Sequence, residues 1–217
     1  MAGVLARLRD KGLVSGWRDE LYPVAAAFDA PPHCLIERAA APHFGIKAYG
    51  VHINGYVETP SGLELWVARR SRSKATWPGK LDHIVAGGQP AGMTCADNVI
   101  KECGEEAGIP PELAATAVPA GAVSYEALQP AGVKRDVLFV YDLRLPADFV
   151  PAPQDGEVES FRRLPIAEVA ALVADTDEFK DNCNLVIIDF LIRHGHIVPE
   201  APGYLALLAG MRCGDCS

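Results

Sequence analysis

Three glutamates, Glu102, Glu105 and Glu106, gather at helical spacing in the segment 87–109, GGQPAGMTCADNVIKECGEEAGI. Carboxylates at spacings of i, i+3 and i+4 share one side of a helix, where they repel one another and weaken the isolated helix. Oxygen ligands of this type bind hard divalent cations such as Mg²⁺, which relieve the repulsion. The pattern therefore predicts a metal site, with Glu102 and Glu106 as primary ligands and Glu105 as a secondary ligand. A solvated acidic surface is the alternative interpretation.

Capping signals in the sequence mark where the helix that carries these glutamates begins and ends. Thr94, with Asp97 three residues later, resembles a capping box, and Gly108 before two prolines gives the stop. One narrow stripe of this helix is apolar and consists of Ala96, Val99, Ile100, Cys103 and Ala107. Asn98 and the three glutamates project from the other side. We expect one face of the helix to pack and the other to hold ions.

The same segment resembles the Nudix box, in which Gly, five residues, Glu and seven residues precede Arg-Glu-aliphatic-x-Glu-Glu-x-Gly-aliphatic. The positions in register are Gly87, Glu102, Glu105, Glu106, Gly108 and Ile109. Met93 stands where the first Glu is expected, Lys101 replaces Arg, and Cys103 replaces an aliphatic residue. In the family the first Glu and the Arg mostly brace the loop and helix, so these departures concern support rather than the main metal positions. Lys101 keeps the positive charge without the planar fork of Arg.

The resemblance implies an α/β fold, a Nudix-type α/β/α sandwich with a mixed sheet. It also implies hydrolysis of a phosphoanhydride bond with Mg²⁺ as cofactor, Mn²⁺ being an alternative. By the same resemblance, the carbonyl of Ala86 is a backbone metal ligand. Glu157, in Asp-Gly-Glu-Val, resembles the distal carboxylate that completes the site or acts as the catalytic base. Glu159 competes for that role, and an ordinary loop charge is the alternative for both.

A more detailed resemblance covers residues 16–195 and concerns the Nudix branch labelled thiamine-pyrophosphokinase-related. The segments that carry it are 16–24, 44–46, 50–56, 80–82, 86–92 and 155–159. Members of that branch are similar to enzymes that hydrolyse thiamine diphosphate or its damaged analogues. The resemblance alone therefore implies this substrate class. Relatives in the branch usually carry more chain upstream, which leaves a shortened form of a longer protein as an open interpretation.

Four further residues are predicted to bind the substrate. Trp77 and Tyr125 are predicted to stack on a flat organic ring, and Arg135 to reach a phosphate. Lys80 ends the densest basic run, residues 69–80, which could serve as a local patch for a phosphorylated ligand. For each of these residues, a packing or solvated surface position is the alternative.

Alternative functions remain open at this stage. A nucleoside diphosphate derivative is the second substrate class, and a Nudix-type isomerase of prenyl diphosphates is a more distant option. A catalytically weak Nudix-like module that binds a phosphorylated ligand is supported only by Met93 and Lys101. Because pocket shape decides ring specificity, the sequence does not rank the substrates.

Composition narrows the expected partners and location. The net charge of -8 over 217 residues argues against binding to a nucleic-acid backbone, which needs clustered Lys and Arg. No apolar stretch reaches the ~18 residues of a membrane span, and charges break the start MAGVLARLRDKG before a signal-peptide core can form. We therefore expect a cytoplasmic protein that acts on a small-molecule diphosphate, with neither nucleic acid nor membrane as partner. A homodimer is left open.

Cysteines and histidines are not predicted to form the site. The six cysteines are scattered and do not resemble a disulfide framework. Cys213 and Cys216 have metal-ligand spacing, but without a second pair a frayed tail is the preferred interpretation. His52 and His83 are assigned to strand packing or loop hydrogen bonds, because Mg²⁺ prefers oxygen ligands.

The expected organisation is one domain with extensions. Residues 1–43 form an N-terminal extension with a short helix at 3–11 and a proline-containing connection at 16–43. The Nudix domain is predicted at 44–197 and a C-terminal tail at 198–217. Strands are predicted at 46–57, 63–70, 121–128, 135–145 and 158–164, and closing helices at 165–174 and 180–194.

Overall fold

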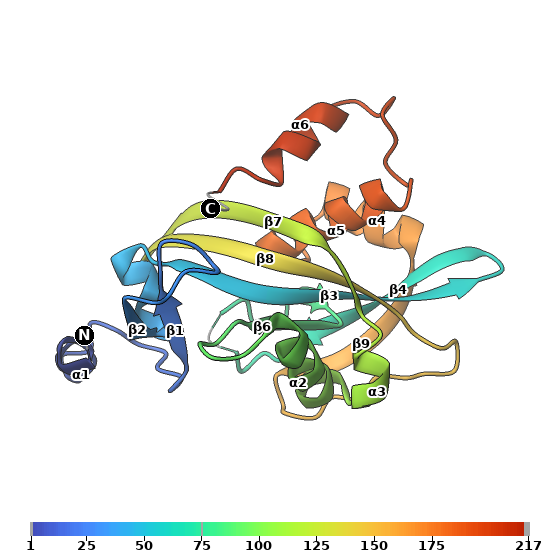
Figure 1. Cartoon of the computed structure of the whole chain (residues 1–217). Coiled ribbons are helices and arrows are strands. Elements are labelled where there is room, and N and C mark those ends of the chain that lie inside the picture. The colour runs from blue at the N-terminus through green and yellow to red at the C-terminus, as the bar shows by residue number, and fades with distance from the viewer. Residues whose placement is uncertain (1, 75, 215–217) are drawn as a thin grey trace.

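The computed structural model describes residues 2–74 and 76–214, and its centre is a seven-stranded mixed sheet (Figure 1). The strands are β3 (Lys47–Thr59), β4 (Gly62–Arg70), β5 (Leu81–His83), β6 (Val85–Gly88), β7 (Val118–Gln129), β8 (Gly132–Arg144) and β9 (Val158–Pro165). The main path runs β5-β4-β3-β8-β7, while β6 pairs with β3 and β9 with β4. β3 and β8 are parallel, and the other pairings among these strands are antiparallel.

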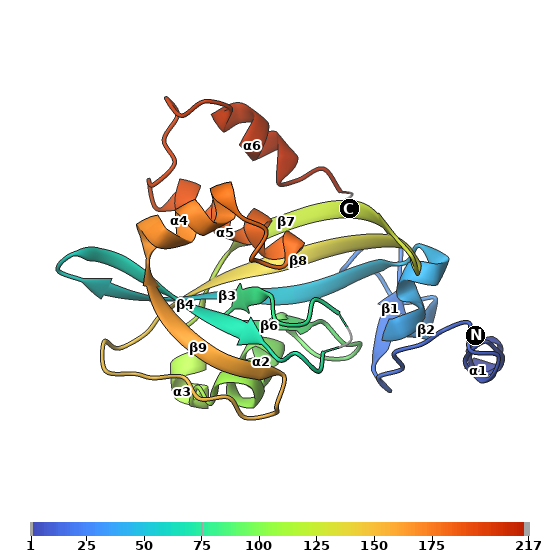
Figure 2. The same ribbon diagram turned by 180° about the vertical axis from the view of Figure 1, so that it is seen from behind.

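Helices cover both faces of the sheet (Figures 1 and 2). α2 (Cys95–Ala107) and α3 (Pro111–Ala114) lie on one face, and α4 (Ile166–Asp175) and α5 (Asp181–Arg193) lie on the other. Each face has its own apolar core: Val99 and Cys103 pack under α2, and Val169 and Phe190 pack under α4 and α5. The predicted α/β/α sandwich with a mixed sheet is confirmed.

Local sequence patterns were sufficient to predict most of these strands and helices. The Thr-Pro-Ser-Gly turn joins β3 to β4 as a hairpin, with Thr59 opposite Gly62. The helices predicted at 165–174 and 180–194 are α4 and α5, and each of their ends lies within one residue of the prediction. The short elements β6 and α3 were not predicted, because four-residue segments carry too little periodicity.

The N-terminal residues form a small layer beside one end of the sheet (Figure 1). Its elements are α1 (Ala2–Asp10), β1 (Leu21–Val24), β2 (Cys34–Glu37) and the 3₁₀ helix η1 (Arg38–Phe44). The predicted first helix is confirmed. The connection expected at 16–43 instead contains a two-stranded antiparallel sheet. This sheet was not predicted, because prolines in a segment argue against strands. Leu5, Val14, Tyr22, Ile36 and Ala40 give this layer a buried cluster of its own.

This layer is docked onto the β7–β8 hairpin through Gly132. The φ angle of Gly132 is +125°, and a Cβ there would lie 2.3 Å from the carbonyl oxygen of Pro42 in η1. Only glycine permits both that backbone conformation and that approach.

The C-terminal residues expected as a tail contain α6 (Tyr204–Gly210). Met211, at its end, is 2% exposed, and its carbonyl accepts a hydrogen bond from the Ser124 backbone at 2.9 Å. Cys213 is exposed, and Cys216 lies outside the described residues. Within the described part of the chain, no helix has the length and apolarity needed to cross a bilayer.

Candidate active site

A cleft of about 510 Å³ opens beside α2 and gathers residues from widely separated parts of the chain. Its volume lies in the range typical of sites for small organic ligands, roughly 300–1,000 Å³. The predicted site residues that line it are Trp77, Ala86, Glu102, Glu105, Glu106, Arg135 and Glu157. The structure places Lys80 and Tyr125 outside this lining.

The box helix α2 has the predicted ends. The Thr94 hydroxyl accepts a hydrogen bond from the Asp97 backbone at 3.1 Å and donates one to the Asp97 carboxylate at 2.6 Å. Gly108 ends the helix in the left-handed region, with φ of 64°. These local caps fix where the helix begins, and so fix which side of it faces the cleft.

Glu102 lies against the start of the box loop. A Cβ at Gly87 would lie 2.4 Å from Cδ of Glu102, so the close approach requires glycine at that position. Burial raises the pKa of Glu102, although Lys101 opposes the shift with an ion pair of 3.1 Å.

Glu106 is held at the bottom of the cleft. Its Oε2 accepts a hydrogen bond from the backbone N–H of Ala86 at 3.0 Å. The pKa of Glu106 is nevertheless raised to about 8, chiefly by burial and in smaller part by the charges of Asp82 and Glu102. Among the described residues, Glu106 forms no ion pair, and the charge of Lys180 opposes the shift only in part.

Glu157 reaches the same cleft from the loop before β9. Its backbone N–H donates to the Asp155 side chain at 2.8 Å, which fixes the turn. Burial alone would raise the pKa of Glu157, but an ion pair with Lys74 lowers it. Glu159, the competitor for its role, pairs with Arg72 at 3.9 Å and lies outside the lining.

Lys101 occupies the position of the Arg in the box pattern. Its ammonium donates to Glu105 at 2.7 Å and to Glu102 at 3.1 Å. It therefore offsets part of the repulsion within the glutamate cluster. The side chain of Glu105 is 55% exposed, which places it at the rim of the cleft.

The box loop is braced by amides that sequence reasoning missed. Asn98 donates to the carbonyl of Gly88 at 2.7 Å and to the side chain of Gln89 at 3.1 Å, and Gln89 donates to the carbonyl of Met93 at 2.7 Å. Asn98, expected on the ion-binding face, is in fact fully buried. Asn98 lies one turn before Glu102 and therefore on the same side of the helix. This spacing was the signal in the sequence that Asn98 faces the box loop.

Trp77 and Arg135 line the cleft but already have neighbours. The Lys134 ammonium lies 5.8 Å from the centre of the Trp77 ring, and Arg135 donates to Glu126 at 2.9 Å. The backbone of Trp77 is in the left-handed region, with φ of 47°. That conformation is uncommon for a bulky residue.

Tyr125 and Lys80 are occupied elsewhere. The Tyr125 hydroxyl donates to Asp136 at 2.7 Å, its cross-strand partner in the β7–β8 pair. Lys80 donates to the carbonyl of Asp177, in the loop before α5. No local pattern in the chain indicates these partners, because they lie far away in the sequence.

The N-terminal layer supplies cleft residues that were not predicted. Arg18, Tyr22 and Arg38 all belong to the lining. No local pattern in the sequence connects them with the box, because the contact depends on how two distant segments pack.

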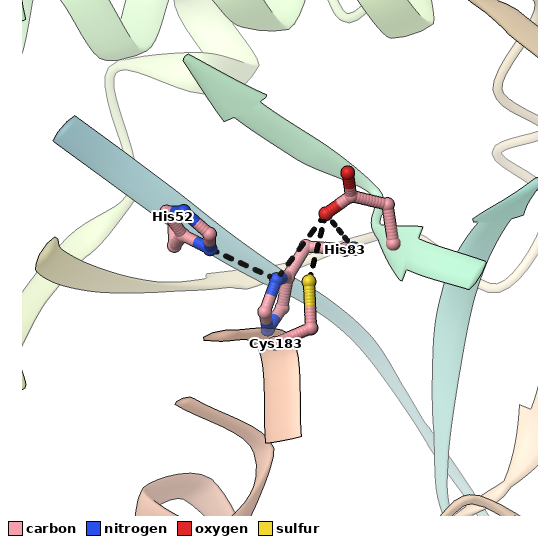
Figure 3. A group of neighbouring side chains, drawn as sticks. His52, His83 and Cys183 are labelled. Atoms are coloured by element: carbon pink, nitrogen blue, oxygen red, sulfur yellow. Dashed lines mark hydrogen bonds and ion pairs between the residues drawn. The ribbon is translucent and has the colours of Figure 1, made fainter. Parts of the chain in front are cut away.

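A second polar cluster adjoins the cleft, which His52 lines, and it contains His52, Asp82, His83 and Cys183, all buried. Figure 3 shows the side chains of His52, His83 and Cys183 pointing toward one another from β3, β5 and α5. Their ligand atoms, with a carboxylate oxygen of Asp82, lie within 4.8 Å of one another. This spacing is compatible with metal coordination.

The charges around Asp82 fit a metal poorly. One of its oxygens accepts hydrogen bonds from the Cys183 thiol and the His83 backbone, both at 2.9 Å. The other accepts from Lys180 at 2.8 Å and Arg70 at 2.7 Å. A bound cation would face these two positive groups across one carboxylate. The cluster is a buried ion-pair network that joins the start of α5 to β5, consistent with the packing role expected for the histidines.

Comparison with known proteins places this geometry in a family. The NUDIX domain profile matches residues 49–183, and a domain of unknown function, DUF4743, matches residues 1–48. The chain is 57% identical to "Nudix hydrolase 20, chloroplastic" and 56% identical to "Nudix hydrolase 24, chloroplastic", both from Arabidopsis thaliana. All of the chain is matched, and it spans 58% and 60% of the lengths of these relatives.

A solved structure shares the fold. The structure of DR0079 from Deinococcus radiodurans aligns with a TM-score of 0.59 and 24% identity, over 79% of this chain and 99% of that one. At this identity the likeness concerns the fold alone.

The expected cytoplasmic location is contradicted by these findings. Both Arabidopsis relatives are chloroplastic by name, so that prediction is wrong. Charge pattern and the lack of a long apolar stretch report on membrane insertion and do not distinguish one aqueous compartment from another. The family itself is shown by the match over most of the chain: this protein belongs to the NUDIX domain family.

Proposed function

We propose that the chain is a divalent-metal-dependent hydrolase of a phosphoanhydride bond in a small organic diphosphate. The observation that carries the proposal is the convergence of Glu102 and Glu106 from α2 with Glu157 from the loop before β9 on one cleft. The same cleft is lined by several lysines and arginines. Carboxylates for a metal and cations for phosphate oxygens are the two groups that this reaction needs.

The carboxylates of α2 suit a divalent cation. Glu102 and Glu106 offer oxygen atoms, the ligand type that Mg²⁺ prefers, and the Ala86 carbonyl is a further candidate. Burial raises the pKa of both carboxyls, which is the condition that a bound cation would relieve. A bound cation would supply charge neutralisation on the phosphates and activation of water. We propose Mg²⁺, with Mn²⁺ as the alternative.

Glu157 is the proposed proton acceptor for the attacking water. Its ion pair with Lys74 favours the ionised carboxylate that a base requires. Lys101 would hold Glu102 and Glu105 in place through its two hydrogen bonds. Glu159 is the weaker candidate because it lies outside the lining of the cleft.

For the organic group, we propose thiamine diphosphate or a damaged analogue, on the resemblance to the thiamine-related branch. Trp77 is the aromatic side chain proposed to contact its ring. The Lys134 ammonium lies 5.8 Å from the centre of that ring and is paired with the Asp136 carboxylate, so this contact does not distinguish a charged thiazolium from an uncharged ring. A nucleoside diphosphate derivative is the second candidate.

A substrate panel tests the proposal. Thiamine diphosphate, an oxidised uncharged analogue, nucleoside diphosphate derivatives and inorganic pyrophosphate are incubated with the protein and Mg²⁺, and released phosphate and product mass are measured. We expect the thiamine compounds to give the monophosphate plus inorganic phosphate, and chelator to stop the reaction. Hydrolysis of nucleoside derivatives at least ~100-fold more efficiently would select the second candidate. Binding without turnover of any compound would favour a binding module.

A further inference from the structure

The N-terminal layer is part of the wall of the cleft. The backbone N–H of Ala91, in the box loop, donates to the carbonyl of Leu21 in β1 at 2.9 Å. Tyr22 is 4% exposed, and a Cβ at Gly88 would lie 1.8 Å from its hydroxyl oxygen. The layer matched by the domain of unknown function is therefore in direct contact with the loop that precedes the metal-binding helix.

Two arginines of this layer face the carboxylate site. Arg38 lies beside the box loop, where its Cζ would be 3.3 Å from a Cβ on Gly88, and its charge interacts with that of Glu102. The charges of Arg18 and Arg38 also act on Glu157, after the stronger effect of Lys74. Arg38 is thus near carboxylates on both sides of the cleft, and Arg18 is near Glu157.

One buried carboxylate holds the backbone at Arg18 and at Ala39, the residue after Arg38. Glu37 is 1% exposed, and its Oε1 accepts hydrogen bonds from the backbone N–H groups of Arg18 at 2.9 Å and Ala39 at 3.3 Å. The Arg38 backbone N–H donates to the carbonyl of Glu20 at 2.8 Å. A buried carboxylate with these partners is costly to displace, so the positions of both arginines are preset.

The two guanidinium groups differ in their present partners. Arg38 donates to the carboxylate of Glu20 at 2.7 Å. The guanidinium of Arg18 makes no hydrogen bond or ion pair within the residues that the structure describes. It lines both the cleft and an adjoining hollow of about 380 Å³ next to Trp17. A planar group with unused donors at such a position suits a phosphate oxygen.

We infer that Arg18 and Arg38 form an anion-binding subsite for the phosphate groups of the substrate, opposite the carboxylates of α2. The inference rests on the proposed function and assigns to the N-terminal layer a direct part in substrate recognition. Glu37 is a positioning residue for this subsite. The ligand chemistry is a phosphate or diphosphate group, whatever organic ring it carries.

Paired kinetic and binding measurements on the whole chain test the inference. The variants are Arg18→Gln, Arg38→Gln and Arg38→Lys, with Arg162→Gln as the matched control, since Arg162 is exposed on β9 and outside the cleft. Loss of a charged hydrogen bond to phosphate should raise KM by about 10- to 100-fold, with kcat within about threefold of wild type. Arg38→Lys should recover only part of the loss, and Arg162→Gln should match wild type.

A second readout does not need turnover. Calorimetric binding of methylenediphosphonate in the presence of Mg²⁺ should weaken in Arg18→Gln by a similar factor. Thermal melting identifies any variant that fails to fold. If Arg38→Gln unfolds, Arg18→Gln decides alone, because the Arg18 guanidinium has no partner among the described residues that the substitution would remove.

The outcomes separate this inference from the proposed function. Wild-type turnover with unchanged KM and unchanged diphosphonate binding in Arg18→Gln would overturn the subsite and leave the hydrolase standing. Diphosphonate binding that depends on Arg18, without wild-type turnover of any substrate, would support the subsite and overturn the hydrolase. Absence of both binding and turnover in wild type would overturn both.

Discussion

The backbone N–H of Ala86 donates to the Glu106 carboxylate at 3.0 Å and links the strand before the box loop to the last turn of α2. This bond fixes one oxygen of Glu106. Burial raises the pKa of the group to about 8 despite the bond. Without a cation, the protonated form of Glu106 is therefore favoured near neutral pH, at the position that we propose for a metal ligand.

Glu106→Gln should separate activity from stability. The amide can still accept the bond from Ala86, but it removes the charge proposed to hold the metal. We expect kcat to fall by at least ~100-fold in Mg²⁺, while the melting temperature of the metal-free protein stays the same or rises. Glu112→Gln, on the exposed surface of α3, is the control and should leave both quantities unchanged. Near-normal activity of Glu106→Gln would contradict the assignment.

Gly87→Ala and Gly104→Ala test the close approach at the start of the box. A Cβ at position 87 would lie 2.4 Å from Cδ of Glu102, whereas position 104 on α2 has open space around it. We expect Gly87→Ala to displace Glu102 and to lower kcat by more than ~10-fold. Gly104→Ala should stabilise the helix by about 0.5–1 kcal/mol, because alanine loses less backbone entropy than glycine on folding. Equal activity of the two variants would show that Glu102 can move without cost.

Asn98→Ala tests the amide brace of the box loop. Removal of its side chain leaves the buried carbonyl of Gly88 without its donor, with an expected loss of about 1–3 kcal/mol in the free energy of unfolding. Urea titration measures this loss. A loss as small as that of Asn184→Ala, on α5 away from the loop, would contradict the bracing role.

The buried histidine pair predicts a pH dependence of stability. Burial lowers the pKa of His52 and His83 below their usual value of 6.5. The unfolded chain therefore binds more protons than the folded one below about pH 6.5, and stability falls as the pH drops through that range. The folded pKa of Glu106 is raised, so this residue has the opposite effect on stability between about pH 4.5 and 8. The test must therefore compare wild type with a variant that lacks the two histidines.

The measurement is the free energy of unfolding at pH 7.5 and 5.5, for wild type and for the His52→Asn, His83→Asn double variant, in chelator. Wild type should lose more stability on acidification than the variant. An equal loss in both proteins would show that the histidines titrate normally.

The contrast between Asn98 and Thr94 shows what could be predicted from sequence. The cap at Thr94 and the stop at Gly108 depend on residues within one turn, so their pattern was sufficient. Asn98 was placed on the ion-binding face because a helical wheel describes angle and not the neighbouring loop that covers it. The β3–β4 hairpin was found for the same local reason as the caps.

Residues whose positions depend on distant contacts were harder to predict. Tyr125 was expected in the cleft, but its hydroxyl has a partner across the β7–β8 pair in Asp136. Arg18 and Arg38 were not expected there, because only the docking of β1 on the box loop brings them to it. The carboxylates of the site belong to a sequence motif and could be located from it. The arginines reach the cleft only through tertiary packing and could not.

The central claim is that α2 and the loop before β9 form one catalytic site, and the pair Glu157→Gln and Glu159→Gln tests it most directly. The two glutamates are neighbours in sequence, but only Glu157 lines the cleft. Phosphate release at saturating substrate and Mg²⁺ should fall ~10- to 1000-fold for Glu157→Gln, with a much smaller change in substrate affinity. Glu159→Gln should retain the wild-type rate. Equal rates for wild type and Glu157→Gln, with Glu159→Gln severely impaired, would contradict the account.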